Sequence, residues 1–167
     1  MRYLKILLVT APLWCLWSCF SFSYNDDDNN RLSSRFQAVV MERTAFENAV
    51  SIMPAMPVQK AGKIYVYGNY LFVNDVNKGF HIYNYSNPSS PQPLGFLAAP
   101  GSTDMAIRDN IFFINQATDL VTLAYNTDSN TITITKRNRN VFPAMRSPDE
   151  FDGQVTDSQV IVDWQPL

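Results

Sequence analysis

His81, the only histidine of the chain, is the first side chain whose chemistry has to be weighed. With Asp75 it could form an acid–base pair. Because it alternates with apolar residues in a strand-like stretch, we expect it instead to face solvent or a neighbouring sheet. The sequence holds no nucleophile elbow, phosphate-binding loop or paired Cys/His metal spacing. We therefore predict no catalytic residue and a protein that is not an enzyme.

Acidic residues gather in the stretch Ser147–Gly153, where Asp149, Glu150 and Asp152 supply hard oxygen atoms. Calcium loops of the EF-hand kind need such ligands at alternate positions, and Pro148 interrupts that spacing. We predict no metal site and no cofactor, with a calcium-binding loop as the alternative.

The N-terminus has the pattern of an export signal. Arg2 and Lys5 precede the apolar stretch Ile6–Trp17, which is shorter than the ~20 residues that a membrane-spanning helix takes. The residues Leu16–Cys19 resemble the lipobox of bacterial lipoproteins, in which a small residue precedes the cysteine. This resemblance implies that residues 1–18 are a signal peptide and that Cys19 becomes the lipidated N-terminus, carrying fatty acids such as palmitate.

The cysteine count agrees with an anchoring role for Cys19. Cleavage would remove Cys15, the only other cysteine, so the exported chain would have no disulfide framework. Acyl chains would hold it to the membrane, since each buried methylene contributes about 0.8 kcal/mol. Residues 19–36 are interpreted as a flexible acidic tether, and the run Ser23–Asn30 resembles surface-export signals of Bacteroidota lipoproteins, with a plain spacer as the alternative. We predict an outer-membrane lipoprotein of the bacterial cell envelope, exposed at the cell surface.

Composition and charge narrow the fold and the partners. Aromatic residues make up 13% of the chain, and the abundance of Tyr, Phe, Val, Ile and Thr favours strands over helices. The formal net charge of −2 argues against nucleic acid, which needs a basic surface. The one basic run, Lys136–Arg139, is interpreted as a solvated loop or strand end. We predict an all-β domain and no nucleic-acid partner.

The lead-in segment, residues 37–61, is expected to hold one strand and one short helix. Gln37–Met41 has the pattern of a strand, and Ala45–Ile52 has apolar residues at helical spacing, with prolines after it. Thr44 and Glu47 have the spacing of a capping box at the start of this helix.

Residues 62–136 contain two copies of one unit. In the first copy, strand-like runs flank the turn Gly68-Asn69, and a proline-rich break follows. Residues 66–74 align with residues 107–115, an offset of 107 − 66 = 41 residues. A period of about 40–45 residues with four strands per unit is that of a β-propeller blade. At this offset the later strands align as Phe80 with Val121 and Ile82 with Leu123.

The first copy resembles the LVIVD repeat, the propeller repeat of exported bacterial proteins. Its turn residues also have physical roles: positive φ at Gly68 and Asn69, and a bulge or bend at Gly79. The prolines Pro88, Pro91 and Pro93 are expected to fix an extended crossing to the outer strand and to stop ladder pairing. With the lipobox, the resemblance points to a short or truncated LVIVD-repeat lipoprotein of Bacteroidota, a family without an assigned activity. The residues that carry the resemblance are Gly68, Asn69, Tyr70, Gly79, Ile82, Asn87, Pro88, Pro91 and Gly95.

Together these patterns predict an all-β fold of antiparallel, four-stranded, blade-like sheets. There is room for about two blades and part of a third, which do not close a propeller of at least ~4 blades. Residues 137–167 are expected to be irregular except for a C-terminal strand, Ser158–Trp164. We expect the lead-in helix and this strand to cover the open flanks of the sheets, or the flanks to self-associate.

A binding or scaffolding module is the predicted function. An enzyme would need Asp, His, Arg or Glu converging at matched positions of the repeats, where this chain has Asn74 and Asn115. A propeller-type hydrolase or lyase, and a truncated relative without independent activity, are the alternatives. Four tyrosines are expected on one sheet face, either packed between blades or forming a platform for a glycan or protein ligand: Tyr65, Tyr67, Tyr83 and Tyr85.

Overall fold

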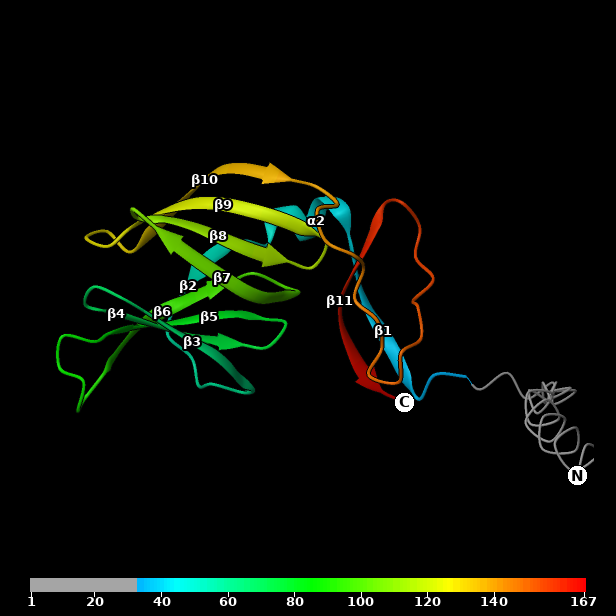
Figure 1. The fold of residues 1–167 in the computed structure, drawn as a ribbon, viewed down its shortest axis with the longest axis horizontal. Helices are drawn as coiled ribbons and strands as arrows, with labels where there is room; N and C mark the ends of the chain where they lie inside the picture. Colours follow the sequence, from blue (N-terminus) through cyan, green and yellow to red (C-terminus); the bar gives the residue numbers. More distant parts are fainter. Residues whose placement is uncertain (1–32) are drawn as a thin grey trace, which may run out of the picture. The chain divides into compact units, whose positions relative to one another are not determined.

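The computed structural model describes residues 33–167, which form antiparallel β-sheets and one short helix (Figure 1). The predicted signal peptide, Cys19 and most of the predicted tether lie outside the described residues and stay predictions. The elements are β1 (Phe36–Glu42), α2 (Arg43–Asn48), β2 (Ser51–Met53), β3 (Ala61–Tyr67), β4 (Tyr70–Asp75), β5 (Gly79–Asn84), β6 (Gln92–Ala98), β7 (Ser102–Arg108), β8 (Ile111–Gln116), β9 (Asp119–Asn126), β10 (Thr131–Asn138) and β11 (Gln159–Pro166).

The two repeats form two separate sheets. The first sheet has the order β2-β6-β5-β4-β3, and the second has the order β10-β9-β8-β7. Every neighbouring pair is antiparallel, and neither sheet closes into a barrel or a propeller. The predicted blade-like architecture is therefore confirmed, with one addition: β2, from the lead-in segment, pairs with the outer edge of β6.

The main core lies between these two sheets. Phe72 of β4 and Phe112 of β8 meet edge to face with ring centroids 5.2 Å apart, and Tyr125 of β9 packs against both rings. Both phenylalanines are almost fully buried. Since replacing a buried Phe by Ala typically costs about 3–5 kcal/mol, this aromatic contact is a major part of the packing between the sheets.

The third sheet pairs the two ends of the described chain. Strand β1 runs antiparallel to β11, and Phe46 of α2 joins Val160 and Val162 in a second, smaller core with Ala117, next to the β8–β9 turn. Figure 1 shows β1, β11 and α2 beside the larger sheets. The C-terminal strand therefore pairs with β1 and not with an edge of either large sheet, whereas α2 contacts one end of the second sheet through Gln116 and Asp119.

The helix is shorter than predicted. It ends at Asn48, and Ile52 belongs to β2 instead. The predicted capping box does not form: the residue before the first turn is Glu42, and no side chain caps the helix. Within the described residues, no helix has the length and apolar character needed to cross a membrane.

The hairpin turns differ between the repeats. Gly68 has a φ of 55°, whereas Asn69 is not among the residues with positive φ, so only one of the two residues predicted to have positive φ does so. Positive φ at the first of the two central residues only is the pattern of a type II′ turn. In the second repeat both turn residues are left-handed, Asp109 at 49° and Asn110 at 66°, as in a type I′ turn.

The predicted alignment of the repeats is wrong by one residue after their second strand. In the ladders, Asn74 lies opposite Phe80, and the matching Asn115 lies opposite Leu120 rather than Val121. The offset there is therefore 120 − 80 = 40 residues, because the β8–β9 turn is one residue shorter than the β4–β5 turn. By the same ladders, Ile82 matches Thr122 and not Leu123. A one-residue shift moves a side chain to the opposite sheet face.

Pro93 also departs from its predicted role. It lies inside β6 and pairs with Tyr83, next to a bulge that accommodates it, whereas Pro88 and Pro91 lie in the connection before the strand.

Candidate functional site

Each large sheet has two faces, and the same face of each repeat has a different environment. The face that holds Phe72 in the first sheet and Phe113 in the second sheet is called the leading face. The opposite face of each sheet is called the trailing face. The leading face of the first sheet packs on the trailing face of the second sheet. The leading side chains in this contact include Tyr65, Phe72, Asn74, Phe80 and Ile82, and the trailing ones include Met105, Ile107, Phe112, Ile114 and Leu123.

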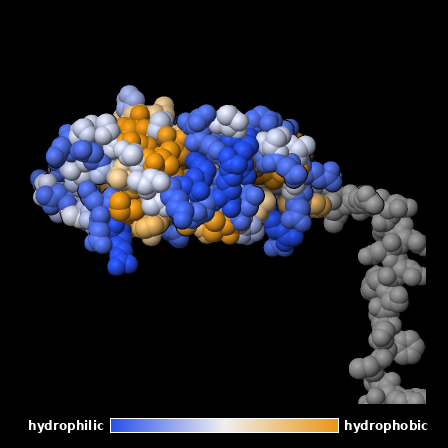
Figure 2. Space-filling view, turned by 90° about the horizontal axis from the view of Figure 1, so that it is seen from above, coloured by the Kyte–Doolittle hydropathy of each residue, from blue (hydrophilic) through white to orange (hydrophobic). Residues whose placement is uncertain are grey.

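The trailing face of the first sheet carries exposed apolar residues at one end, whereas Asp75 and His81 are buried at its other end. On the trailing face of the first sheet, Ile64 is 64% exposed and Val66 is 58% exposed. Their counterparts in the second sheet are Met105, which is only 4% exposed, and Ile107, which packs against the core. Figure 2, which views the molecule from above, shows hydrophobic residues gathered among hydrophilic ones over the part that holds the larger sheets. Exposed apolar surface of this kind marks interaction sites.

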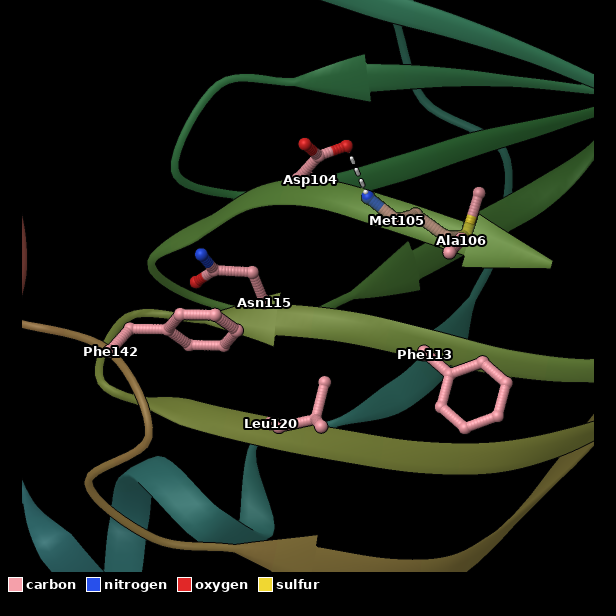
Figure 3. Close-up of a pocket in the computed structure, with 7 residues that line it drawn as sticks. All are labelled: Asp104, Met105, Ala106, Phe113, Asn115, Leu120 and Phe142. Atoms are coloured by element: carbon pink, nitrogen blue, oxygen red, sulfur yellow. Dashed lines mark hydrogen bonds between the residues drawn. The ribbon is translucent and has the colours of Figure 1, made fainter.

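The leading face of the second sheet contains a cavity of about 300 Å³. Figure 3 shows the Asn115 amide between Asp104 of β7 and the ring of Phe142, which comes from the segment after β10. The Asn115 Oδ1 atom is buried and has no hydrogen-bond partner among the described residues. An unsatisfied buried oxygen of this kind costs stability unless a partner reaches it. The lining residues are Asp104, Met105, Ala106, Phe113, Asn115, Leu120 and Phe142.

The matching residue of the first repeat, Asn74, bonds through its amide nitrogen. Asn74 is 1% exposed, and its Nδ2 donates to the carbonyl oxygen of Gly79 at 3.1 Å and to that of Ser102 at 3.4 Å. Ser102 is the first residue of β7, so this amide joins the first sheet to the start of the second. The position of Asn115 is thus one at which the first repeat contacts the next blade.

A polar cluster also joins the inner strands of the two sheets. The Tyr65 hydroxyl donates to Asp104 at 2.6 Å and accepts the Met105 backbone amide at 3.2 Å, and Lys63 pairs with the same carboxylate. Hydrogen bonds from Lys63 and Tyr65 lower the pKa of Asp104. Burial and the hydrogen bond to Asp104 raise the pKa of Tyr65 to about 12. Asp104 is therefore ionised near neutral pH and fixes the register of β3 against β7.

Asp119 is the centre of a buried ion cluster that the sequence pattern did not reveal. Its fully buried carboxylate binds Arg43 of α2 at 2.8 Å and Arg137 of β10 at 3.0 Å, and both guanidinium groups lie about 5.5 Å from the centre of the Phe46 ring. The interpretation of Lys136–Arg139 as a solvated loop or strand end is therefore wrong for Arg137, whose side chain is largely buried in this cluster. A basic residue paired with an acidic one more than 70 residues away leaves no local signal.

His81 forms a buried pair with Asp75 instead of facing solvent. Its Nε2 lies 3.0 Å from Asp75 Oδ2, and the carboxylate also accepts the backbone amides of Gln59 and Lys60. Burial raises the pKa of the Asp75 carboxyl, but these hydrogen bonds outweigh burial and hold it below its ordinary value. The His81 ring packs on Phe96. The pair fastens residues 59–60 across the sheet, which is a structural role.

The predicted tyrosine platform is not a single surface. Tyr65 and Tyr67 pack toward the second sheet, whereas Tyr83 lies opposite Leu71 on the other face, and the Tyr85 backbone amide bonds to Asn69. Strand alternation explains the division, because Tyr65 and Tyr83 have opposite orientations in the ladder.

The acidic stretch is engaged in local contacts. Asp149 accepts hydrogen bonds from Ser34, Ser147 and the backbone of Arg35, and Asp152 pairs with Arg146. Among residues 33–167 no group of three metal-ligating side chains comes together.

The comparison with protein families agrees with this geometry for the first sheet. No curated protein and no solved structure matches the chain. The family model of the LVIVD repeat matches residues 59–95, which cover β3, β4, β5 and the first part of β6. This part of the first sheet is therefore similar to an LVIVD repeat, which suggests a β-propeller-like module.

Proposed function

We propose that this protein is an exported, lipid-anchored module that binds or scaffolds other molecules through the free faces of its two blade-like sheets. One observation carries the proposal: Ile64 and Val66 are largely exposed, whereas the matching Met105 and Ile107 of the second repeat lie in the contact with the other sheet. A face built like a buried one but exposed to solvent favours association. The buried ionisable pairs, Asp75 with His81 and Asp119 with its arginines, serve packing, which supports binding over catalysis.

Photo-cross-linking tests the binding face. The full chain carries a photoreactive amino acid at Val66 and is expressed in a bacterium that processes lipoproteins. We expect covalent products at Val66 that are absent when the same group replaces Val40, which is 38% exposed on β1, outside the two larger sheets. Equal yields at the two positions, or no product at Val66, would contradict the proposal.

The anchor is tested separately. Metabolic labelling with an alkyne fatty acid should mark the wild-type chain, and Cys19→Ala should abolish this label, since the lipobox resemblance implies lipidation of Cys19. Cys15→Ser is the matched control and should keep the label. A label that survives Cys19→Ala would remove the anchor from the proposal without affecting the binding face.

A further inference from the structure

We infer that the partner of the two free faces is a second copy of this chain, joined head to tail. The leading face of the second sheet of one copy packs on the trailing face of the first sheet of the next copy. This inference rests on the proposed function and names its binding partner.

The matching of the repeats supports this pairing. Inside one chain a leading face already packs on a trailing face, and the ladders place the same kinds of residue on the free faces. Phe113 takes the place of Phe72 on the leading side, and Leu71 takes the place of Phe112 on the trailing side. The contact between Phe72 and Phe112 is therefore repeated between copies as one between Phe113 and Leu71.

The charges on the inner strands are complementary in the same arrangement. Lys63 and Asp104 occupy the matching position of β3 and β7, because the residues that follow them pair alike in the two ladders. Within one chain they form an ion pair. One blade further along, Asp104 meets Lys63 of the next copy, so the charges alternate around the assembly and never meet a like charge.

The Asn115 side chain takes the position of Asn74 in this arrangement. Asn74 donates to Ser102, the first residue of the following sheet, and the residue that matches Ser102 in the first sheet is Ala61. In the assembly the Asn115 Nδ2 lies next to the start of β3 in the second copy, where it can donate to a carbonyl oxygen as the Asn74 Nδ2 does. Phe142 covers one end of this leading face and leaves Ala106 and Arg108 exposed for the contact.

A head-to-tail contact forms a ring when its rotation closes. Each copy contributes two blades, and propellers have about 4–8 blades, so rings of about two to four copies are expected. Each of the two larger sheets in such a ring packs on another sheet through both of its faces.

Cross-linking between copies tests the register. Two full chains with different C-terminal tags are co-expressed, one with Leu71→Cys and the other with Phe113→Cys. We expect disulfide-linked products with both tags, several-fold more than in the two mixtures where both chains carry the same new cysteine. Ile64→Thr with Val66→Thr in the Leu71→Cys chain should remove the product while keeping β-branched side chains, and Val40→Thr should leave it unchanged. Products no more abundant than in the same-cysteine mixtures would overturn the inference.

A charge exchange provides the second arm. The double variant Lys63→Asp/Asp104→Lys keeps the pair within its own chain and the alternation among its own copies. When the exchanged chain is mixed with the unexchanged chain, residue 104 of one chain and residue 63 of the other carry the same charge where they meet. We expect the cross-link in this mixture to fall by about two- to fivefold, the range of an exposed charge pair, and to be retained between two exchanged chains. Equal cross-linking in both mixtures would overturn the charge argument. Photo-products from Val66 that contain only other proteins would leave the proposed function standing and overturn this inference.

Discussion

The two large sheets have matching strand ladders, but they differ at the turn between their second and third strands. In the first sheet a three-residue turn leads to Gly79, and the buried pair of Asp75 and His81 closes that end. In the second sheet a shorter turn leads to Asp119, which binds Arg43 from the helix. The difference shows that alternating apolar residues determine the sheet, while turn length and a few buried polar residues decide how each end attaches to the rest of the molecule.

The largest effect is expected at Gly79. Its φ is 152°, and an added Cβ would lie 2.1 Å from the Leu97 carbonyl oxygen and 2.8 Å from the Phe96 ring. We expect Gly79→Ala to destabilise the fold by about 3–5 kcal/mol, because backbone strain and overpacking act together. Chemical denaturation measures this change. A loss below about 1 kcal/mol would show that β6 moves aside easily, so that Gly79 does not set the end of the first sheet.

The matching position of the second sheet should respond through charge. Asp119→Asn removes the anion between Arg43 and Arg137, and breaking a buried ion pair costs about 3 kcal/mol or more. Burial raises the pKa of the Asp119 carboxyl, but the hydrogen bonds from the two arginines outweigh burial, so that the pKa lies below its ordinary value.

The sign of the pH dependence follows from that shift. A carboxyl whose pKa is lower in the folded than in the unfolded chain stabilises the fold above about pH 4, and this contribution is lost as the pH falls through the folded-state pKa. The stability difference between wild type and Asp119→Asn should therefore be largest near neutral pH and shrink below pH 4. Denaturation curves from pH 7 to pH 3 measure it, and a difference that grows on acidification would contradict the assignment.

Much of the fold could be predicted from local patterns. The turn Gly68-Asn69 between aromatic runs predicted the first hairpin, and the repeat offset predicted a second sheet of the same kind. Both are confirmed, since short antiparallel strands with alternating residues carry their signal within about ten residues.

The contacts between distant segments could not be predicted. The pairing of β1 with β11 joins strands more than 100 residues apart, and neither strand indicates its partner. The alignment of β9 with β5 was wrong by one residue, because the turn before β9 is one residue shorter than the turn before β5. The sequence also does not indicate which face of each sheet is free, because this depends on how the two sheets pack on each other.

A smaller effect is expected at the first hairpin. No atom lies within 4 Å of a Cβ added at Gly68, so Gly68→Ala meets no steric clash and only the cost of its φ of 55°. We expect a loss of about 1 kcal/mol, well below that of Gly79→Ala, because a left-handed conformation is strained for residues with a Cβ. Thermal and chemical denaturation of both variants test this ranking. Equal losses would mean that φ, and not the contact with Leu97, dominates at Gly79.

The smallest effect is expected at the second hairpin, and it has the opposite sign. Asn110 has a φ of 66° in a type I′ turn, where Asn-Gly and Asp-Gly are favoured. Asn110→Gly gives the sequence Asp-Gly there and keeps the backbone amide that donates to the Tyr67 hydroxyl at 3.2 Å. It loses only a long, partly buried hydrogen bond from the side chain to the Tyr125 carbonyl oxygen at 3.4 Å. We expect stabilisation of about 0.5 kcal/mol, since relief of the left-handed strain exceeds the entropy that glycine adds to the unfolded chain. Chemical denaturation measures it, with Asn69→Gly as the matched control: Asn69 is not left-handed, so glycine there should destabilise the fold. If both substitutions destabilised the fold equally, the distinction between the two turn types would be wrong.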